Sequence, residues 1–265
     1  MKFVARVVKK EPLTRNDKFI LLSMIPIYFI VVGMVLQPID EIIVGIGHIF
    51  EEPDFLITDY FVIGGFGAAF LNAGAITLMS IGILYALGKE VSGHTITSIC
   101  LMFGFSLFGK NLLNIWTILF GVFLYAKYHK TSLSRYIYVG YYGTSLSPII
   151  TQVMQIEPMP PAGRFLLCLL MGTVIGFVLP PLATHVHYAH QGYSLYNVGF
   201  ASGIIATVIV SVFKSFGFET QSRLIWSTGN NLLFMGVLIT LFGGMILLGM
   251  IRDGKKIFSF YWKIL

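Results

Sequence analysis

The segment FILLSMIPIYFIVVGMVL (residues 19–36), followed directly by QPIDEIIVGIGHIFEEPDFLITDY (residues 37–60), decides the fold. The first segment is almost entirely apolar and long enough to cross a hydrocarbon core of about 30 Å. The second contains six of the twelve acidic residues and no Lys or Arg, whereas six Lys and Arg lie in residues 1–18. Because basic flanks stay in the cytoplasm, we predict a cytoplasmic head over 1–18 and an acidic outer loop over 37–59.

The composition places the whole chain in a bilayer. Hydrophobic residues make up 56% of the 265 residues and charged residues 11%, with a mean hydropathy of +0.81. Soluble domains carry about 25% charged residues, so this chain has too little polar surface to coat a soluble globule. The apolar runs are solid rather than alternating, which favours an all-α polytopic membrane protein over a β-barrel. The net charge of +6 lies beside apolar segments and therefore predicts no nucleic-acid partner.

About eight membrane segments are expected within one integral membrane domain spanning residues 1–265. They are residues 19–36, 57–87, 95–108, 112–126, 136–150, 163–183, 192–213 and 229–251. Residues 40–50 are too short to cross and are expected to form a helix on the outer interface. Some segments are short, broken or re-entrant, and no linker divides the chain.

Three of these segments leave alternatives open. The run 57–87 is longer than a bilayer requires, so it is either a tilted helix or a helix broken near Asn72. The runs 95–108 and 112–126 are each shorter than a usual span. They therefore form either two short spans or a re-entrant hairpin, and both alternatives place Lys110 at the turn.

The distribution of basic residues predicts the sidedness. Fourteen of the 18 Lys and Arg fall on the predicted cytoplasmic side of the eight-segment arrangement, which puts both termini in the cytoplasm. Lys214 and Arg223 are exceptions, because they fall on the predicted outer side. The expected location is a plasma membrane.

Four polar residues within apolar surroundings are the candidate substrate-binding residues: Asn72, Lys110, Asn111 and Asn197. A buried amide needs hydrogen-bonding partners, so Asn72 and Asn197 either join helices or line a solute path. A lysine at depth costs roughly 3 kcal/mol or more. Lys110 is therefore either an interfacial anchor or a cationic site facing a cavity, which would favour an anionic or polar neutral solute.

Glycine patterns accompany these residues. Gly67-x4-Asn72-x-Gly74 recurs as Gly192-x4-Asn197-x-Gly199, which is a faint internal repeat of the kind found in transporters. Gly172-x3-Gly176 and Gly199-x3-Gly203 have the small-xxx-small spacing that is typical of close helix packing.

No pattern predicts catalysis or a cofactor. His185, His187 and His190 do not share a helix face and lack an accompanying carboxylate or cysteine, so an interfacial loop is expected there rather than a metal site. No nucleophile motif, metalloprotease motif or phosphate-binding loop is present. We therefore expect a non-enzyme without cofactor or bound metal. Because almost no acid lies within a span, carboxylate-based proton coupling is weakly supported.

Several motifs resemble an uncharacterised family of bacterial multi-pass membrane proteins, catalogued as a domain of unknown function. They are TDYFVIGGFGAAFLNAG (58–74), FGKN (108–111) with Asn114 and Gly121-Val122, Gly143-Thr144 with Pro148, HQGYSLYNVGF (190–200) and SRLIWSTGNN (222–231). The likeness covers most of residues 50–260. It implies longer members that carry a second copy of the Asp-Tyr…Asn-x-Gly…Phe-Gly-Lys unit. This chain would then be a short member or an N-terminal part, with two chains pairing to rebuild a two-copy pathway. The resemblance implies no substrate and no catalytic residue.

Three classes of function are compared. A transporter or channel for a small polar or anionic solute is favoured by the short and broken segments and by the intramembrane Asn and Lys residues. A non-transporting scaffold or sensor subunit would use the same Asn and Gly residues for packing alone. An intramembrane enzyme is the weakest class. The expected partners are the lipid bilayer and a small solute, with a homo-oligomer as a further expectation.

Overall fold

The computed structural model describes residues 12–54, 57–157, 159–191, 193, 196–218 and 224–254. Most of the basic head (1–11), the tail lysines at 255, 256 and 263, Arg223, and Gly192 of the internal repeat lie outside the described residues.

Five described helices are long and apolar enough to cross a membrane. They are α2 (Arg15–Leu36), α5 (Gly65–Ala86), α10 (Pro161–His190), α11 (Asn197–Ser215) and α12 (Asn231–Asp253). At 1.5 Å per residue, the 22 residues of α2 span about 33 Å, slightly more than the hydrocarbon core. The prediction of an all-α polytopic protein is confirmed, and the protein is membrane-embedded.

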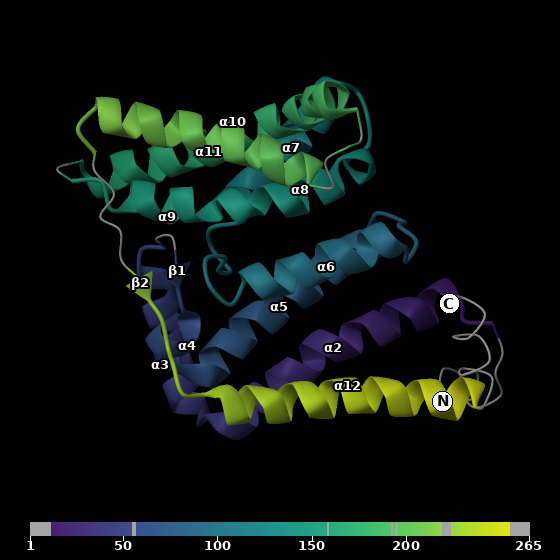
Figure 1. The fold of residues 1–265 in the computed structure, drawn as a ribbon. Coiled ribbons are helices and arrows are strands. Elements are labelled where there is room, and N and C mark those ends of the chain that lie inside the picture. The colour runs from purple at the N-terminus through teal and green to yellow at the C-terminus, as the bar shows by residue number, and fades with distance from the viewer. Residues whose placement is uncertain are drawn as a thin grey trace.

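Shorter elements connect these helices. They are α3 (Ile39–Glu51), β1 (Ile57–Thr58), α4 (Tyr60–Ile63), α6 (Gly93–Phe105), α7 (Trp116–Tyr128), η1 (Leu133–Arg135), α8 (Ile137–Gly143), η2 (Thr144–Leu146), α9 (Ser147–Met154) and β2 (Leu224–Ile225). The predicted interfacial helix over 40–50 is present as α3. In Figure 1 it runs across the left end of the molecule, roughly perpendicular to the long helices.

The helices form two groups, which Figure 1 shows one above the other. The lower group contains α2, α5, α6 and α12, with α3 and α4 at one end. The upper group contains α7 to α11, in which α7 and α10 pack along each other. Two short parallel strands join distant parts of the chain, since Ile57 pairs with Leu224 and Thr58 with Ile225.

One end of the molecule carries the basic residues at the helix termini. Thr14 and Asp17 form a reciprocal cap that starts α2. The Arg15 guanidinium, at the first residue of α2, donates to the carbonyl of Tyr85 in the last turn of α5 and to that of Lys89 just after α5. The Lys89 ammonium lies over the ring of Tyr138 at the start of α8. The first turn of α2 therefore lies beside the end of α5 and the start of α6, at the end of the molecule where α12 also finishes (Figure 1).

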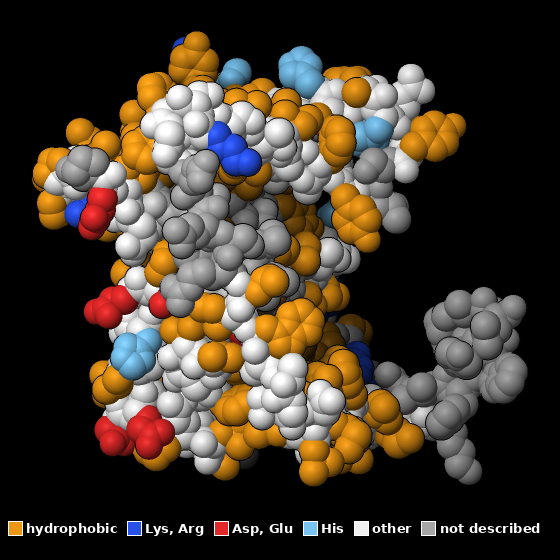
Figure 2. All heavy atoms as spheres, turned by 60° about the vertical axis from the view of Figure 1, so that its left-hand side comes forward, with side chains coloured by type: hydrophobic (Ala, Val, Ile, Leu, Met, Phe, Trp, Pro, Cys, Tyr) orange, Lys and Arg blue, Asp and Glu red, His pale blue; other side chains and the backbone are white. Residues whose placement is uncertain are grey.

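The opposite end carries the acidic segment. Figure 2 shows acidic side chains gathered on the lower part of this face, where α3 lies. Here the Gln155 amide donates to the Glu51 carbonyl, and Asp59 accepts from both the backbone N–H and the hydroxyl of Ser227. The backbone of Tyr60 also donates to the Leu107 carbonyl. The acidic segment is thus joined to α9, to the α6–α7 connection and to the residues that precede α12.

The segment 57–87 is interrupted, but not where the sequence indicated. The chain turns at Gly65, whose φ of +83° favours glycine, and α5 then continues unbroken through Asn72. The Gln37 side chain caps this new helix, because its Oε1 accepts from Gly67 N at 2.7 Å and Ala68 N at 3.2 Å. The alternative of a break near Asn72 is therefore wrong. A glycine turn stabilised by a neighbouring amide supplies the break instead.

Two further segments are discontinuous. The predicted span 136–150 consists of the short helices α8 and α9 joined by the 3₁₀ turn η2. The runs 95–108 and 112–126 form α6 and α7, each 13 residues or about 20 Å long, which is too short to cross alone. The connection between them, residues 106–115, folds against α5, α8 and α9.

Close backbone contact holds α7 against α10. A Cβ atom at Gly121 would overlap the Thr173 carbonyl, and one at Gly176 would overlap the Ile118 carbonyl. The packing role predicted for Gly172-x3-Gly176 is therefore supported. Gly203, by contrast, has no atom within 4 Å of its would-be Cβ, so the spacing Gly199-x3-Gly203 does not mark a helix contact here.

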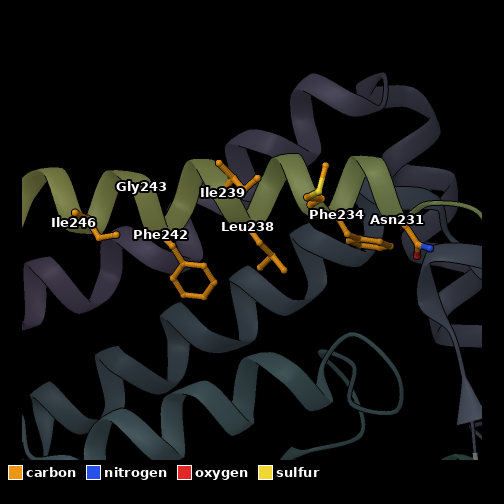
Figure 3. Close-up of a pocket in the computed structure, with 8 residues that line it drawn as sticks. Asn231, Phe234, Leu238, Ile239, Phe242, Gly243 and Ile246 are labelled. Atoms are coloured by element: carbon orange, nitrogen blue, oxygen red, sulfur yellow. The ribbon is translucent and has the colours of Figure 1, made fainter.

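Helix α12 lies at the edge of the molecule and is largely exposed. It is attached through Tyr28, whose hydroxyl donates to the Val237 carbonyl at 2.8 Å, and through the ring of Phe234 against Phe61. A shallow apolar groove runs along it (Figure 3), lined by Asn231, Phe234, Met235, Leu238, Ile239, Phe242, Gly243 and Ile246. Such an apolar surface suits contact with acyl chains.

Candidate functional site

The candidate site is the connection between α6 and α7, residues 106–115, together with the side chains that hold it. Its non-helical backbone is buried by protein on several sides, which is the setting in which irregular backbone is tolerated at membrane depth. Lys110, Asn111 and Asn114 are all at most 3% exposed. Three of the four candidate substrate-binding residues, Asn72, Lys110 and Asn111, are thus brought together at this connection, whereas Asn197 is not.

Asn72, about two turns into α5, holds this connection through its side-chain amide. Its Nδ2 donates to the carbonyls of Ser106 at 2.7 Å and Lys110 at 2.8 Å. Two carbonyl partners fix the orientation of the amide, because only the NH₂ group can bond to both. The Asn72 Oδ1 is buried and has no hydrogen-bond partner among the described residues. The site thus retains one unused acceptor, the Asn72 Oδ1. Leaving a buried acceptor unpaired costs the folded state about 1–3 kcal/mol.

The Lys110 side chain turns inward from the same connection. It is 1% exposed, with its Nζ 3.4 Å from the Tyr141 carbonyl and 3.5 Å from the Met102 Sδ. The ammonium also lies 4.9 Å from the centroid of the Phe105 ring, within the range of a cation–π contact. An ammonium has three donors, and these contacts are long for charge-assisted hydrogen bonds. Lys110 therefore does not extend to the interface as an anchor.

Asn111 and Asn114 shape the turn itself. The Asn111 Oδ1 accepts from the backbone N–H groups of Leu113 and Asn114, and the Asn114 Oδ1 accepts in return from Asn111 N at 3.0 Å. The Asn114 amide then donates to the Gly109 carbonyl at 3.1 Å. Asn111 is therefore a turn-forming residue in this structure, with its amide oxygen committed to the backbone.

A buried carboxylate lies against the other side of this turn. Asp54, which follows α3 within the acidic segment, is fully buried. Its Oδ1 accepts from the Tyr60 hydroxyl at 2.6 Å, and its Oδ2 accepts from the Asn114 Nδ2 at 3.2 Å. The Thr151 Oγ1 of α9 lies 3.1 Å from the same Oδ2. One carboxyl group thus contacts α4, the α6–α7 connection and α9.

Burial changes the titration of this group. Loss of hydration and, to a lesser extent, the nearby Glu52 charge raise the pKa of Asp54, whereas the hydrogen bonds that Tyr60 and Asn114 donate lower it, and the net result is a pKa of about 6. The desolvation effect is the largest. Asp54 therefore changes its charge near pH 6, while an ordinary Asp titrates near pH 4.

Asn197 belongs to a different part of the fold. It begins α11, where its Nδ2 donates to the Ala183 carbonyl at 3.0 Å and its Oδ1 lies 2.8 Å from the His190 Nε2. It therefore joins α11 to the end of α10. Asn72 lies about two turns inside α5 and Asn197 is the first residue of α11, so the two Asn residues of the faint sequence repeat do not occupy equivalent structural positions.

The three histidines lie on a helix rather than in the expected loop. His185, His187 and His190 belong to the last two turns of α10, and the rings of His187 and His190 meet edge to face at 5.3 Å. Within the described part of the chain, no group of three or more His, Cys, Asp or Glu side chains is arranged to hold a metal ion.

Sequence reasoning missed Asp54, Tyr60 and Thr151 as members of the site. Asp54 was one of six acids in a segment that read as a solvated outer loop, and nothing in its spacing distinguishes it from Glu51 or Glu52. Tyr60, six residues later, and Asn114, within the Lys-Asn-x-x-Asn sequence, were the available signals. The contact with Thr151 joins residues 97 positions apart and has no local signature.

Comparison with known proteins identifies a family without assigning an activity. No curated protein and no solved structure matches the chain. The family model described as "Protein of unknown function (DUF1576)" matches residues 38–215, which is more than half of the 265 residues and includes the whole candidate site. The chain therefore belongs to the DUF1576 family of proteins of unknown function.

Proposed function

We propose that this membrane protein is a transporter or channel for a small anionic or polar neutral solute, and that Lys110 is the group that attracts the solute. The observation that carries the proposal is the buried Lys110 ammonium, whose polar contacts among the described residues are two long ones, to the Tyr141 carbonyl and the Met102 Sδ. A membrane protein retains a costly buried cation most readily where a solute or ion path uses it.

Two features support a path at this position. The α6–α7 connection and the α8–η2–α9 segment are both interrupted, and they meet at Lys110 and Ser147, whose hydroxyl donates to the Gly109 carbonyl. Interrupted helices that meet within a membrane are the usual surroundings of transporter binding sites. The unused Asn72 Oδ1 adds a hydrogen-bond acceptor, which a polar solute with an O–H or N–H group could use.

The proposal includes the sidedness expected from the charges. The acidic end with α3 faces out, and the end with Arg15 and Lys89 faces the cytoplasm of a plasma membrane. The protein has no catalytic step, cofactor or nucleic-acid partner in this proposal. Because Lys110 is buried, a solute reaches it only after the surrounding segments move apart.

Flux measurements test the proposal directly. We expect liposomes containing the full chain to take up at least one solute from a panel of chloride, nitrate, acetate, phosphate and glycerol. Lys110→Met keeps the length of the side chain but removes its charge, and it should reduce anion flux at least tenfold. Lys127→Met removes an exposed lysine and is the matched control. Equal flux in the wild type and Lys110→Met would exclude the role assigned to Lys110.

A non-transporting scaffold or sensor subunit is the second candidate. It is favoured by the two short hydrogen bonds from Asn72 to the connection and by the role of Asn197 between α10 and α11, which are both packing contacts. Cysteine labelling at positions 72, 110 and 197 separates the candidates. Water-accessible positions 72 and 110 favour a pathway, whereas unreactive positions together with absent flux favour the scaffold.

A further inference from the structure

Asp54 differs from the other acidic residues at its end of the molecule because it is fully buried. Asp40, Glu41 and Glu51 of α3 are exposed, and Asp59 is half-buried and bonded to Ser227. Asp54, by contrast, lies between three separate elements, and its backbone takes part as well. Its N–H donates to the Thr151 Oγ1 at 3.2 Å, and its carbonyl accepts from the Gln152 amide at 3.2 Å.

The single hydrogen of the Thr151 hydroxyl faces two acceptors, the Pro148 carbonyl and the Asp54 Oδ2. Thr151 Oγ1 already accepts from the Asp54 N–H, and it lies 2.9 Å from the Pro148 carbonyl and 3.1 Å from the Asp54 Oδ2. A threonine hydroxyl carries one hydrogen and can donate only once. If it donates to Pro148, the shorter contact, its lone pair faces Oδ2. A proton on Oδ2 then makes both contacts favourable at once.

Asn114 connects this carboxyl group to the proposed solute site. One hydrogen of its Nδ2 points to the Asp54 Oδ2 and the other to the Gly109 carbonyl, at 3.2 and 3.1 Å. Gly109 precedes Lys110, whose carbonyl is in turn held by Asn72. The charge on Asp54 therefore acts, through one amide, on the turn that positions Lys110.

Few other charged or titratable groups of the described residues face Asp54. Tyr60 from α4 donates its hydroxyl, and Glu52 from the end of the preceding segment adds a negative charge. The sequence of α9, SPIITQVM, has no ionisable side chain. On the α6–α7 connection the one cation is Lys110, whose ammonium turns toward Tyr141 and Met102 instead.

We propose that Asp54 is a proton-binding site between its Oδ2 and the Thr151 Oγ1, and that proton binding there is linked to opening of the turn that carries Lys110. The carboxylate takes a proton from water on the acidic side and becomes a neutral acid that donates to Thr151. With the proton bound, the acidic segment, the connection and α9 stay packed together. Loss of the proton leaves a buried charge, which is relieved when the three elements separate and water enters.

A proton bound at Asp54 would be an ion linked to solute movement, and this part of the inference rests on the proposed function. The protonation itself does not depend on transport. By linkage, the equilibrium shifts toward the open state as the pH rises through the titration of Asp54. If the pKa of Asp54 returns to its ordinary value in the open state, the equilibrium constant for opening rises by a factor of roughly 100.

Infrared spectroscopy of the full chain in lipid nanodiscs tests the protonation without any solute. We expect a protonated-carboxyl C=O band that disappears between pH 5 and pH 8 with a midpoint near 6, and that is absent in Asp54→Asn. Asp40→Asn, which removes an exposed acid from the same end, should leave the band unchanged. A wild-type spectrum with no such band, or one that persists in Asp54→Asn, overturns the proposal.

A second variant keeps the test independent of how well Asp54→Asn folds. Thr151→Val removes the oxygen that accepts the bound proton while keeping the side-chain shape. We expect the midpoint of the band to fall by at least half a pH unit. A midpoint that rises would mean that Thr151 donates to an ionised carboxylate, which would overturn the assigned position of the proton.

Hydrogen exchange tests the link to Lys110. After correction for base catalysis, amides of residues 106–116 should exchange at least tenfold faster at pH 8 than at pH 5 in the wild type. In Asp54→Asn the two corrected rates should agree. Equal rates in the wild type would overturn the link. A titrating band together with pH-dependent exchange, in a protein that moves none of the tested solutes, would support the proton site and exclude the proposed transport.

Discussion

At the scale of single residues, Lys110 offers a test that separates function from stability. A charged amine that is buried for function destabilises the fold, because burial costs roughly 3 kcal/mol or more. We therefore predict that Lys110→Met stabilises the protein by about 1–3 kcal/mol while it reduces flux. Chemical unfolding in detergent, followed by the exposure of Trp and Tyr residues, would measure the change.

Lys127→Met is again the control, because Lys127 is exposed at the end of α7. Its free energy of unfolding should stay within about 0.5 kcal/mol of the wild type. If Lys110→Met instead lowered the stability by more than 1 kcal/mol, the lysine would be a structural residue held by Tyr141 and Phe105.

The raised pKa of Asp54 predicts a pH dependence of stability. The pKa is about 6 in the folded protein and 3.8 in an unperturbed Asp, so the folded state binds the proton more tightly. The contribution of Asp54 protonation to the free energy of unfolding is thus fully present below about pH 4 and is lost as the pH rises through 6. The stability lost between these two pH values amounts to about 3 kcal/mol. Unfolding measured from pH 4.5 to 7.5 should show stability falling with pH, and Asp54→Asn should flatten this slope.

The sequence predicted part of the site at this scale. Lys110 and Asn72 stood out because a charge and an amide within apolar runs are visible in one dimension, and both lie in the buried site. Asp54 was hidden among exposed acids, and its environment depends on Thr151 and Asn114, which only the tertiary fold brings close. Asn197 looked equivalent to Asn72 from three matched positions, yet the two residues join different helices.

At the scale of helices, the contact between α7 and α10 gives a steric prediction. In Gly176→Ala the new methyl group would overlap the backbone carbonyl of Ile118, and no side-chain rotation can relieve it. The two helices must separate, so we expect a loss of about 1–3 kcal/mol. Thermal unfolding in detergent would measure it, with Gly203→Ala as the matched control.

Gly203→Ala places a methyl group in open space on α11. It should be neutral or slightly stabilising, since Ala favours a helix by up to about 1 kcal/mol over Gly. Equal effects of the two substitutions would mean that the close approach of α7 and α10 does not contribute to stability.

Hydropathy located the elements well and their interruptions poorly. The long helices follow from runs of apolar residues, and α3 follows from a run too short to cross. The break before α5 depends on Gly65 and on the Gln37 side chain, which lies 27 residues earlier than its partner Gly64. The division of 136–150 into α8, η2 and α9 depends on packing against α6 and α10. Neither effect has a hydropathy signal.

At the scale of the whole molecule, the contacts at the two ends define a topology. The start of α2, the end of α5 and the start of α8 meet through Arg15, Lys89 and Tyr138, and Tyr125 near the end of α7 contacts Tyr136. The opposite end collects α3, Asp54, the tip of the α6–α7 connection and the end of α9. The α6–α7 pair therefore enters from and returns to the basic end, although each of its helices is too short to cross.

This arrangement predicts which positions react from each side of the membrane. Single cysteines at Lys130, after α7, and at Lys89, before α6, should be labelled by an impermeant maleimide only from the cytoplasm, in a background with Cys100 and Cys168 replaced by Ser. Cysteines at Asp40 and Glu157 should be labelled only from outside. The connection 106–115 reverses the direction of the chain, so α7 returns to the end of the molecule from which α6 started. Residues 89 and 130 must therefore lie on the same side of the membrane. Labelling of positions 89 and 130 from opposite sides would require an odd number of crossings between them, which contradicts the paired path of α6 and α7 and with it the position of Lys110.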